Sequence, residues 1–183
     1  RQDLLDAVSE GIDLEVIPGV EEARLIALGV FGDVGPSERT VEIDIGGGST
    51  EVVIREKGED IFLDSLSMGA VRYNYSMGID FTHRVSSSDY SHILRSVDIA
   101  SYHAVNKVRT LGFRKAVGSS GTAIALAEAC AARRGDRDPS YLTLPELHAL
   151  MIDLCGMDAP DRQSLAGIGK NRTDIIIPGG AIM

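Results

Sequence analysis

Apolar and polar residues alternate over residues 41–45, and an apolar run at 52–54 follows three consecutive glycines. Alternation with a period of two is typical of a strand that buries one face. The glycines between the two segments allow the chain to fold back tightly. The pattern predicts a strand, a glycine turn and a return strand. The apolar residues of the first strand face one way, and Glu42 and Asp44 face the other.

A turn at residues 57–60 and a third strand at 61–66 continue this pattern. Three short strands joined by tight connections predict an antiparallel meander. Two further strands are expected, one at 12–17 that stops at a Pro-Gly pair and one at 114–117. An isoleucine run within residues 172–183 also indicates a strand locally, although the proline inside it argues against one.

Helical periodicity accounts for most of the remaining chain. Residues 86–89 are N-cap candidates for a long helix that ends near Gly112, and Thr143 with Glu146 forms a capping box for another. Shorter helices are expected to end at Gly11, to cover residues 21–29, to begin at 68, and to cover 123–131 and 158–165. The buried stripe expected on the long helix consists of Ile93, Val97, Ala100, Ala104, Val108 and Leu111.

The composition is that of a globular protein, with 44% hydrophobic and 25% charged residues among 183. No apolar run reaches the roughly 20 residues that span a bilayer, and no apolar leader opens the chain. Cys130 and Cys155 lack CxxC spacing, which favours reduced thiols and a cytoplasmic protein. The net charge of −9 argues against nonspecific nucleic-acid binding, which requires a cationic surface.

The glycine turn has a second interpretation as a phosphate cradle. Its backbone N–H groups and the hydroxyls of Ser49 and Thr50 could bind a phosphate. Asp44 before the turn and Glu51 after it could hold a hydrated divalent cation against that phosphate. On these residues alone, a glycine-rich hairpin with acidic residues facing solvent is an equally good interpretation.

Two other stretches have both a functional and an ordinary explanation. Residues 118–122 (GSSGT) lie between an expected strand and an expected helix, where unsatisfied N–H groups could bind an anion, but serine and threonine also cap helices. Glu21 and Glu22 open a helix, where acidic residues complement the macrodipole without any catalytic role.

Most catalytic arrangements fit poorly. The four histidines lack metal-ligand spacing, and no GxSxG, HExxH or GxxxxGK motif is present. Phosphoryl transfer to water needs a positioned phosphate, neutralisation of its charge and a carboxylate that orients the water. Glu22, Asp44 and Glu51, together with the two glycine-rich turns, could supply all three.

Five segments, in order, resemble the exopolyphosphatase/guanosine pentaphosphate phosphohydrolase (Ppx/GppA) family. They are IPGVEEARLI at 17–26, DIGGGSTE at 44–51, SMGAVR at 67–72, VGSSGT at 117–122 and RTDIIIPGG at 172–180. DIGGGST alone is also typical of actin-like ATPases and sugar kinases, but its spacing from the first segment makes the combination specific. The resemblance covers nearly the whole chain.

The resemblance implies an α/β domain of the actin-like, ribonuclease H-like ATPase fold. Its mixed sheet would contain an antiparallel three-strand meander flanked by helices. Residues 1–183 would form the second half of a two-domain phosphatase core, without the first domain and the C-terminal extension. The start at Arg1 and the end in mid-pattern agree with a piece of a longer protein. Residues 172–183 would be largely helical, against their local strand pattern.

The resemblance also assigns roles to residues. Glu22 matches the glutamate that activates water, with Glu21 as the neighbouring candidate, and Glu51 is expected to be catalytic as well. Asp44 and Glu51 match ligands of Mg²⁺ or another divalent cation. Phosphate-binding residues are expected in two loops, namely Gly46, Gly47, Gly48, Ser49 and Thr50 in the first and Gly118, Ser119, Ser120, Gly121 and Thr122 in the second.

The implied function is Mg²⁺-dependent hydrolysis of a terminal phosphoanhydride of inorganic polyphosphate or guanosine pentaphosphate (pppGpp) in the cytoplasm. The missing first domain would supply half of the cleft and part of the basic residues for the polyanion. Because half of the cleft is absent, residues 1–183 alone are expected to be inactive or nearly so. A homodimer of the full-length protein is one expected assembly, and neither nucleic acid nor membrane is an expected partner. The alternatives are an actin-superfamily kinase or ATPase, and a non-catalytic polyphosphate or nucleotide sensor.

Overall fold

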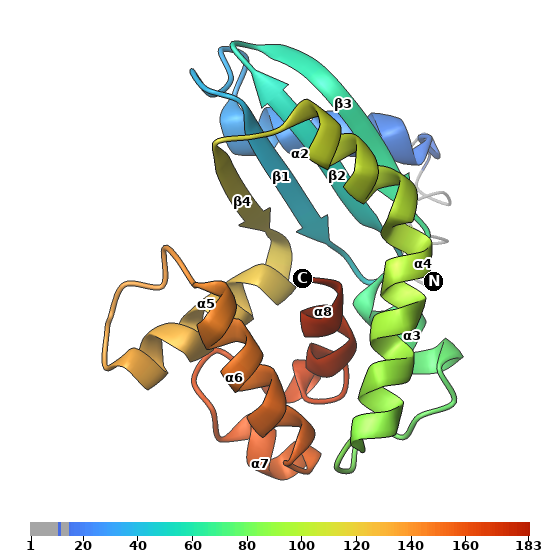
Figure 1. The fold of residues 1–183 in the computed structure, drawn as a ribbon, viewed down its shortest axis with the longest axis vertical. Coiled ribbons are helices and arrows are strands. Elements are labelled where there is room, and N and C mark those ends of the chain that lie inside the picture. The colour runs from blue at the N-terminus through green and yellow to red at the C-terminus, as the bar shows by residue number, and fades with distance from the viewer. Residues whose placement is uncertain (1–10, 12–14) are drawn as a thin grey trace.

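The computed structural model describes residue 11 and residues 15–183, which are built around a four-stranded sheet in the order β3-β2-β1-β4 (Figure 1). β1 (Thr40–Ile45), β2 (Thr50–Glu56) and β3 (Glu59–Leu66) form the expected antiparallel meander. β4 (Lys115–Ser119) pairs with β1 in parallel. The sheet is therefore mixed, and β1 and β4 end at the same edge.

Helices lie on both faces of the sheet. α2 (Gly19–Phe31) packs against β2 and β3 from one side, and α4 (Ser87–Leu111) crosses the other side (Figure 1). α5 (Ser120–Arg134) follows β4 without an intervening loop. The remaining elements are α3 (Ala70–Ser76), α6 (Leu144–Cys155), α7 (Ala159–Gln163), the 3-10 helix η1 (Lys170–Arg172) and α8 (Ile176–Ile182).

The alternation along the strands separates two apolar layers. Val41 and Ile45 of β1 belong to the main core, which also contains α8 and the buried sides of α4, α5 and α6. A smaller cluster lies under α2 and includes Val53 of β2. Because Val53 is paired with Glu42, the acidic side of β1 faces this smaller cluster. Glu42 does not face solvent there, since it is only 1% exposed.

The two capped helix starts predicted from the sequence, before α4 and α6, are confirmed, whereas the helix expected to begin at residue 68 begins at Ala70. Ser86 caps α4 by accepting a hydrogen bond from the N–H group of Asp89 at 3.1 Å. Thr143 and Glu146 form the complete capping box of α6. The stripe on α4 differs at one position, because Ala100 is exposed and Ser101 is buried instead. The stripe runs from Val97 to Ser101 by a spacing of four residues and on to Ala104 by a spacing of three, and the predicted stripe has these two spacings in the opposite order.

Two strand predictions are wrong. Residues 15–17 form no strand, and Val16 is 95% exposed, so no sheet buries that alternating pattern. Residues 12–14 and the helix expected to end at Gly11 lie outside the described residues. The isoleucine run forms α8, whose seven residues are all buried. A segment buried on every side has no periodicity that distinguishes helix from strand. The helical character implied by the family resemblance is confirmed here.

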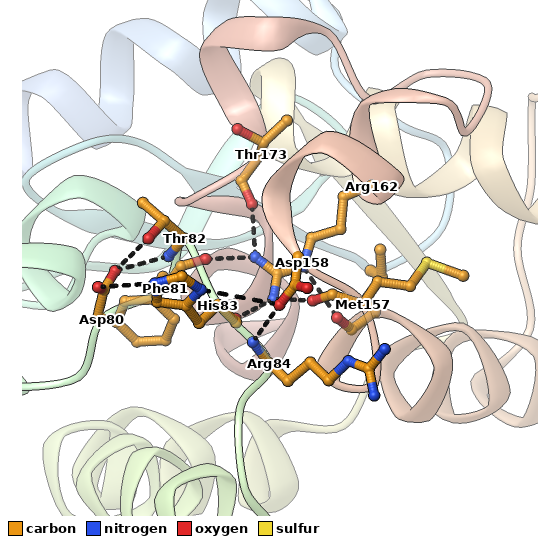
Figure 2. A network of polar contacts seen from close by, with 10 residues as sticks. Asp80, Phe81, Thr82, His83, Arg84, Met157, Asp158, Arg162 and Thr173 are labelled. Atoms are coloured by element: carbon orange, nitrogen blue, oxygen red, sulfur yellow. Dashed lines mark hydrogen bonds and ion pairs between the residues drawn. The ribbon is translucent and has the colours of Figure 1, made fainter.

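Arg162 is fully buried in α7 and joins three segments that are distant in sequence (Figure 2). Its guanidinium group donates only to main-chain carbonyl oxygens among the described residues. The acceptors are Leu154 at 2.9 Å, Met157 at 2.6 Å, His83 at 2.7 Å, Thr173 at 3.0 Å and Phe81. One side chain thus connects the end of α6, the segment before α4 and the segment before α8.

Neither a disulfide nor a membrane-spanning helix is found among the described residues. Cys130 and Cys155 are both free, and Cys130 is buried. No helix within the described part of the chain is long and apolar enough to cross a membrane.

Candidate active site

Asp44 and Glu51 lie side by side in a row that crosses all four strands. Asp44 is paired with Glu51 of β2 and with Ser119 of β4, and Glu51 is paired with Ser65 of β3. Directly paired residues point to the same face of a sheet. Ser65 Oγ donates to Glu51 Oε1 at 2.8 Å, and Ser119 Oγ donates to Asp44 Oδ2 at 2.7 Å. Each carboxylate is therefore oriented by a serine of the outer neighbouring strand.

α2 brings Glu22 to the same row. Its first residue, Gly19, packs so closely on β3 that a Cβ atom there would collide with Ser65 Oγ. Burial raises the pKa of Glu51, which is 2% exposed, and two serine hydroxyls oppose this effect. The charges of Glu22 and Asp44 raise the same pKa further. The three acidic residues singled out from the sequence are thus gathered at one place.

Glu22 rather than Glu21 has the available carboxylate. Arg24 donates to Glu21 from Nε at 2.9 Å and from Nη2 at 2.6 Å, and this hydrogen bonding lowers the pKa of Glu21. Glu22 is exposed and forms no hydrogen bond or ion pair with the residues that the structure describes. Its carboxylate can therefore accept a proton from water without first breaking an ion pair.

The carbonyl oxygens of the loop at residues 46–49 already accept hydrogen bonds, which leaves N–H groups as the free polar groups of its backbone. The first N–H groups of α3 and Arg72 Nε donate to the carbonyl oxygens of residues 46–48 at 2.6 to 3.0 Å. Within the described chain, the N–H groups of Gly47 and Gly48 have no backbone partner, and both residues are exposed. A loop with tethered carbonyls and free N–H groups is suited to an anion.

Thr50 supports this loop from behind. It is fully buried, and its Oγ1 donates to the carbonyl oxygen of Met68 at 2.8 Å. Thr50 is paired with Ile45, so its side chain lies on the main-core face, opposite to Glu51. The hydroxyl predicted to bind phosphate is therefore committed to an internal hydrogen bond, whereas Ser49 remains half-buried at the loop.

Gly69→Ala is expected to distort the phosphate loop. A Cβ atom on Gly69 would lie 2.5 Å from the carbonyl oxygen of Gly47 and 2.7 Å from the carbonyl carbon of Gly48, and backbone atoms cannot rotate away. We expect a loss of about 1–3 kcal/mol in the free energy of unfolding, measured by urea denaturation. Binding of inorganic pyrophosphate, measured by calorimetry, should weaken as well.

Gly29→Ala is the matched control for this substitution. Gly29 lies inside α2, and a Cβ atom there would meet nothing within 4 Å. Replacing a helical glycine by alanine in open space should stabilise the protein by up to about 1 kcal/mol. Unchanged stability and pyrophosphate affinity in the Gly69 variant would contradict the close packing of α3 on the loop.

The second glycine-rich stretch is a direct junction between a strand and a helix. β4 ends at Ser119, and α5 begins at Ser120, whose φ is +70°. Ser119 is the N-cap residue of α5, but its side chain makes no capping hydrogen bond. The first N–H groups of a helix have no partner within it. At the start of α5 they therefore remain available to an anion.

Arg172 places a positive charge at this junction. Its guanidinium group lies directly against Gly121, where a Cβ atom would collide with it. Thr122, in contrast, is 3% exposed and lies beside Gly179. Of the five residues predicted in this stretch, Ser119, Ser120 and Gly121 form the junction itself. Gly118 belongs to β4.

Sequence reasoning did not identify four residues of this site, namely Glu42, Ser65, Arg72 and Arg172. Arg72 and Arg172 lie within segments that resemble the family, and this was the signal that could have found them. Ser65 and Glu42 carry no local signal. Their place in the site follows only from the register of the strands.

Asp44 and Glu51 fit a Mg²⁺ ion that also takes water and phosphate oxygens. Proteins usually hold Mg²⁺ by one or two carboxylates together with substrate phosphates. Within the described residues, no group of three or more His, Cys, Asp or Glu side chains is arranged to hold a metal. Burial and the neighbouring charges of Glu22 and Asp44 raise the pKa of Glu51, and a cation would offset this repulsion.

Comparison with known proteins identifies the family. Residues 1–183 match the Ppx/GppA phosphatase family. A guanosine-5′-triphosphate,3′-diphosphate pyrophosphatase of Aeromonas hydrophila is 35% identical over 173 residues, which are 93% of this chain and 33% of that protein. A Haemophilus influenzae protein, provisionally named an exopolyphosphatase, is 30% identical over 178 residues, 93% of this chain and 51% of that protein. The chain thus spans between a third and half the length of these relatives.

A solved structure supports the same assignment at the level of the fold. The crystal structure of an exopolyphosphatase from Cytophaga hutchinsonii aligns with a TM-score of 0.82 at 24% identity, covering 99% of this chain and 60% of that one. This likeness shows the actin-like ATPase fold that the sequence resemblance implied. With the match over residues 1–183, it follows that the chain belongs to the Ppx/GppA phosphatase family.

Proposed function

We propose that the protein containing this chain hydrolyses the terminal phosphoanhydride of either inorganic polyphosphate or pppGpp. The observation that carries this proposal is the pair of Asp44 and Glu51 at the sheet edge that also carries the loop at 46–49 and the start of α5, with N–H groups that have no backbone partner among the described residues. The names of the Aeromonas and Haemophilus relatives provide the two candidate substrates.

The N–H groups of Gly47 and Gly48 and the first turn of α5 would bind the oxygens of the terminal phosphates. Arg172 would offset their negative charge, which matters in a chain of net charge −9. Glu22 would accept a proton from the attacking water. The water oxygen forms a bond to phosphorus as the anhydride P–O bond breaks, which releases inorganic phosphate and a shortened chain.

Asp44 and Glu51 would hold a Mg²⁺ ion, which when bound neutralises charge on the phosphates and the leaving oxygen. The chain's own contribution is to orient both carboxylates. Ser119 and Ser65 do this by hydrogen bonds of 2.7 and 2.8 Å. Asp44→Asn should therefore raise the Mg²⁺ concentration that gives half-maximal activity.

A parallel assay of the full-length protein tests the proposal. Phosphate release from inorganic polyphosphate and from pppGpp is measured with Mg²⁺, and ATP with candidate hydroxyl acceptors serves as the competing substrate. Phosphate release from inorganic polyphosphate or from pppGpp supports the proposal and identifies the substrate. ATP-dependent phosphorylation alone would favour a kinase, and tight polyphosphate binding without turnover would favour a sensor. Either of these two results refutes the proposed hydrolysis.

The same assay on residues 1–183 alone is expected to give no turnover. The chain spans 33% of the Aeromonas relative, and the basic residues needed for a polyanion would come partly from the rest of the protein. Robust phosphate release by residues 1–183 would contradict this expectation.

A further inference from the structure

Glu42 is buried at a position that packing alone would give to an apolar residue. It is 1% exposed, and its pairing partners on the two sides are Val53 of β2 and Val117 of β4. Its Oε2 atom has no hydrogen-bond partner among the described residues. Burying a carboxyl group with an unpartnered oxygen costs free energy. Within the described residues, the fold gains from this carboxyl group only a hydrogen bond with Ser119 and the attraction of the Arg55 charge.

Ser119 connects Glu42 to Asp44. Its Oγ lies 3.1 Å from Glu42 Oε1 and 2.7 Å from Asp44 Oδ2. A serine at an N-cap position ordinarily turns its hydroxyl towards the helix and accepts a hydrogen bond from the second or third N–H group. Ser119 occupies the N-cap position of α5 without making that bond. The two carboxyl groups thus hold the hydroxyl away from the helix.

We propose that Glu42 is a positioning residue that prevents Ser119 from capping α5, an inference that rests on the proposed function. Two consequences follow for the site. The first N–H groups of α5 stay available to a phosphate, and Asp44 keeps the hydrogen-bond donor that orients it. Glu42 itself touches neither phosphate nor metal. Without Glu42, Asp44 alone holds the Ser119 hydroxyl, and a Ser119 side chain that turns to the helix accepts from the N–H groups of α5 and competes with the phosphate for them.

Four variants of the full-length protein test this inference, namely Glu42→Leu, Glu42→Gln, Ser119→Ala and the double variant Glu42→Leu/Ser119→Ala. Glu42→Leu should weaken pyrophosphate binding, measured by calorimetry, and raise KM about tenfold, the effect of one lost hydrogen bond to a charged group. Glu42→Gln keeps an acceptor oxygen for Ser119 and should stay within about threefold of wild type.

The double variant distinguishes a positioning role from a structural one. If Glu42 acts only through Ser119, adding Glu42→Leu to Ser119→Ala should change pyrophosphate affinity no further, because no hydroxyl remains to cap α5. Glu42→Leu should also unfold at a temperature no lower than wild type, since leucine fits between two valines and Arg55 keeps its ion pair with Asp60 at 3.3 Å. Weaker binding without lost stability is the expected signature.

Three results would overturn the inference. They are an unchanged pyrophosphate affinity in Glu42→Leu, additive effects in the double variant, or a loss of affinity that only follows a loss of stability. Because pyrophosphate binding requires no turnover, the test is independent of the assay for the proposed function. A wild-type protein that binds pyrophosphate but hydrolyses neither inorganic polyphosphate nor pppGpp would refute the proposed function. It would leave the role of Glu42 in binding standing.

Discussion

Glu22→Gln is expected to lower kcat for phosphate release by about 100-fold to 10,000-fold, the usual contribution of a general base. Glutamine keeps the size of the side chain but cannot accept the proton of the attacking water. KM should stay within a few-fold of wild type, because the proposed phosphate site consists of backbone N–H groups and does not include Glu22. Steady-state phosphate release by the full-length protein, with the better of its two substrates, measures both constants.

Glu21→Gln is the matched control, one residue away on the same helix. It removes the partly exposed ion pair with Arg24, which solvent screens and which contributes little to stability. Its kcat should therefore stay within about twofold of wild type. If Glu21→Gln lost activity and Glu22→Gln kept it, the base would be Glu21. Wild-type kcat in both variants would exclude either glutamate as the base.

Arg162→Met is expected to lower the free energy of unfolding by about 4 kcal/mol or more, because five carbonyl oxygens, three of them in buried hydrogen bonds, lose this donor and each unsatisfied buried group costs about 1–3 kcal/mol. Methionine has a similar length and supplies no N–H group. Urea denaturation of the full-length protein gives the change in stability. Amide hydrogen exchange should locate the loss in residues 81–84 and 154–173, which this side chain joins.

Arg133→Met is the control for Arg162→Met. Arg133 lies at the end of α5 with an exposed side chain and an ion pair to Asp153, so its replacement should cost less than about 1 kcal/mol. If the Arg162 variant lost no more stability than this control, the carbonyl oxygens around it would have to find other partners. That result would refute Arg162 as the connection between α6, the segment before α4 and the segment before α8.

Much of the site could be predicted because it lies within one hairpin. The alternation of residues 41–45 places Glu42 and Asp44 on one face, and the glycines between two apolar runs fix the turn. The antiparallel register then places Asp44 opposite Glu51. Local pattern also predicts the capping box of α6, because both of its partners lie within four residues.

The rest depends on contacts that no local pattern encodes. Ser65 reaches Glu51 only through the register of β3, and Ser119 reaches Asp44 only through the parallel pairing of β4. Glu42 has the sequence pattern of a solvent-facing residue, yet it is buried, and its strand partner Val53 lies in the cluster under α2. Arg172 comes to Gly121 from a segment whose own conformation was ambiguous, since a wholly buried apolar run has no periodic signal.

The parallel pairing of β4 with β1 also bears on the order in which the site forms. Asp44 and Ser119 are 75 residues apart in the chain, whereas Asp44 and Glu51 belong to one hairpin. Closing a long loop costs conformational entropy before any contact compensates for it, so the hairpin should form early and β4 should join late. If unfolding follows the reverse order, β4 and the first turn of α5 open before the rest of the site. In native-state hydrogen exchange their amides should exchange ahead of those of β2, and the reverse order would contradict this sequence of events.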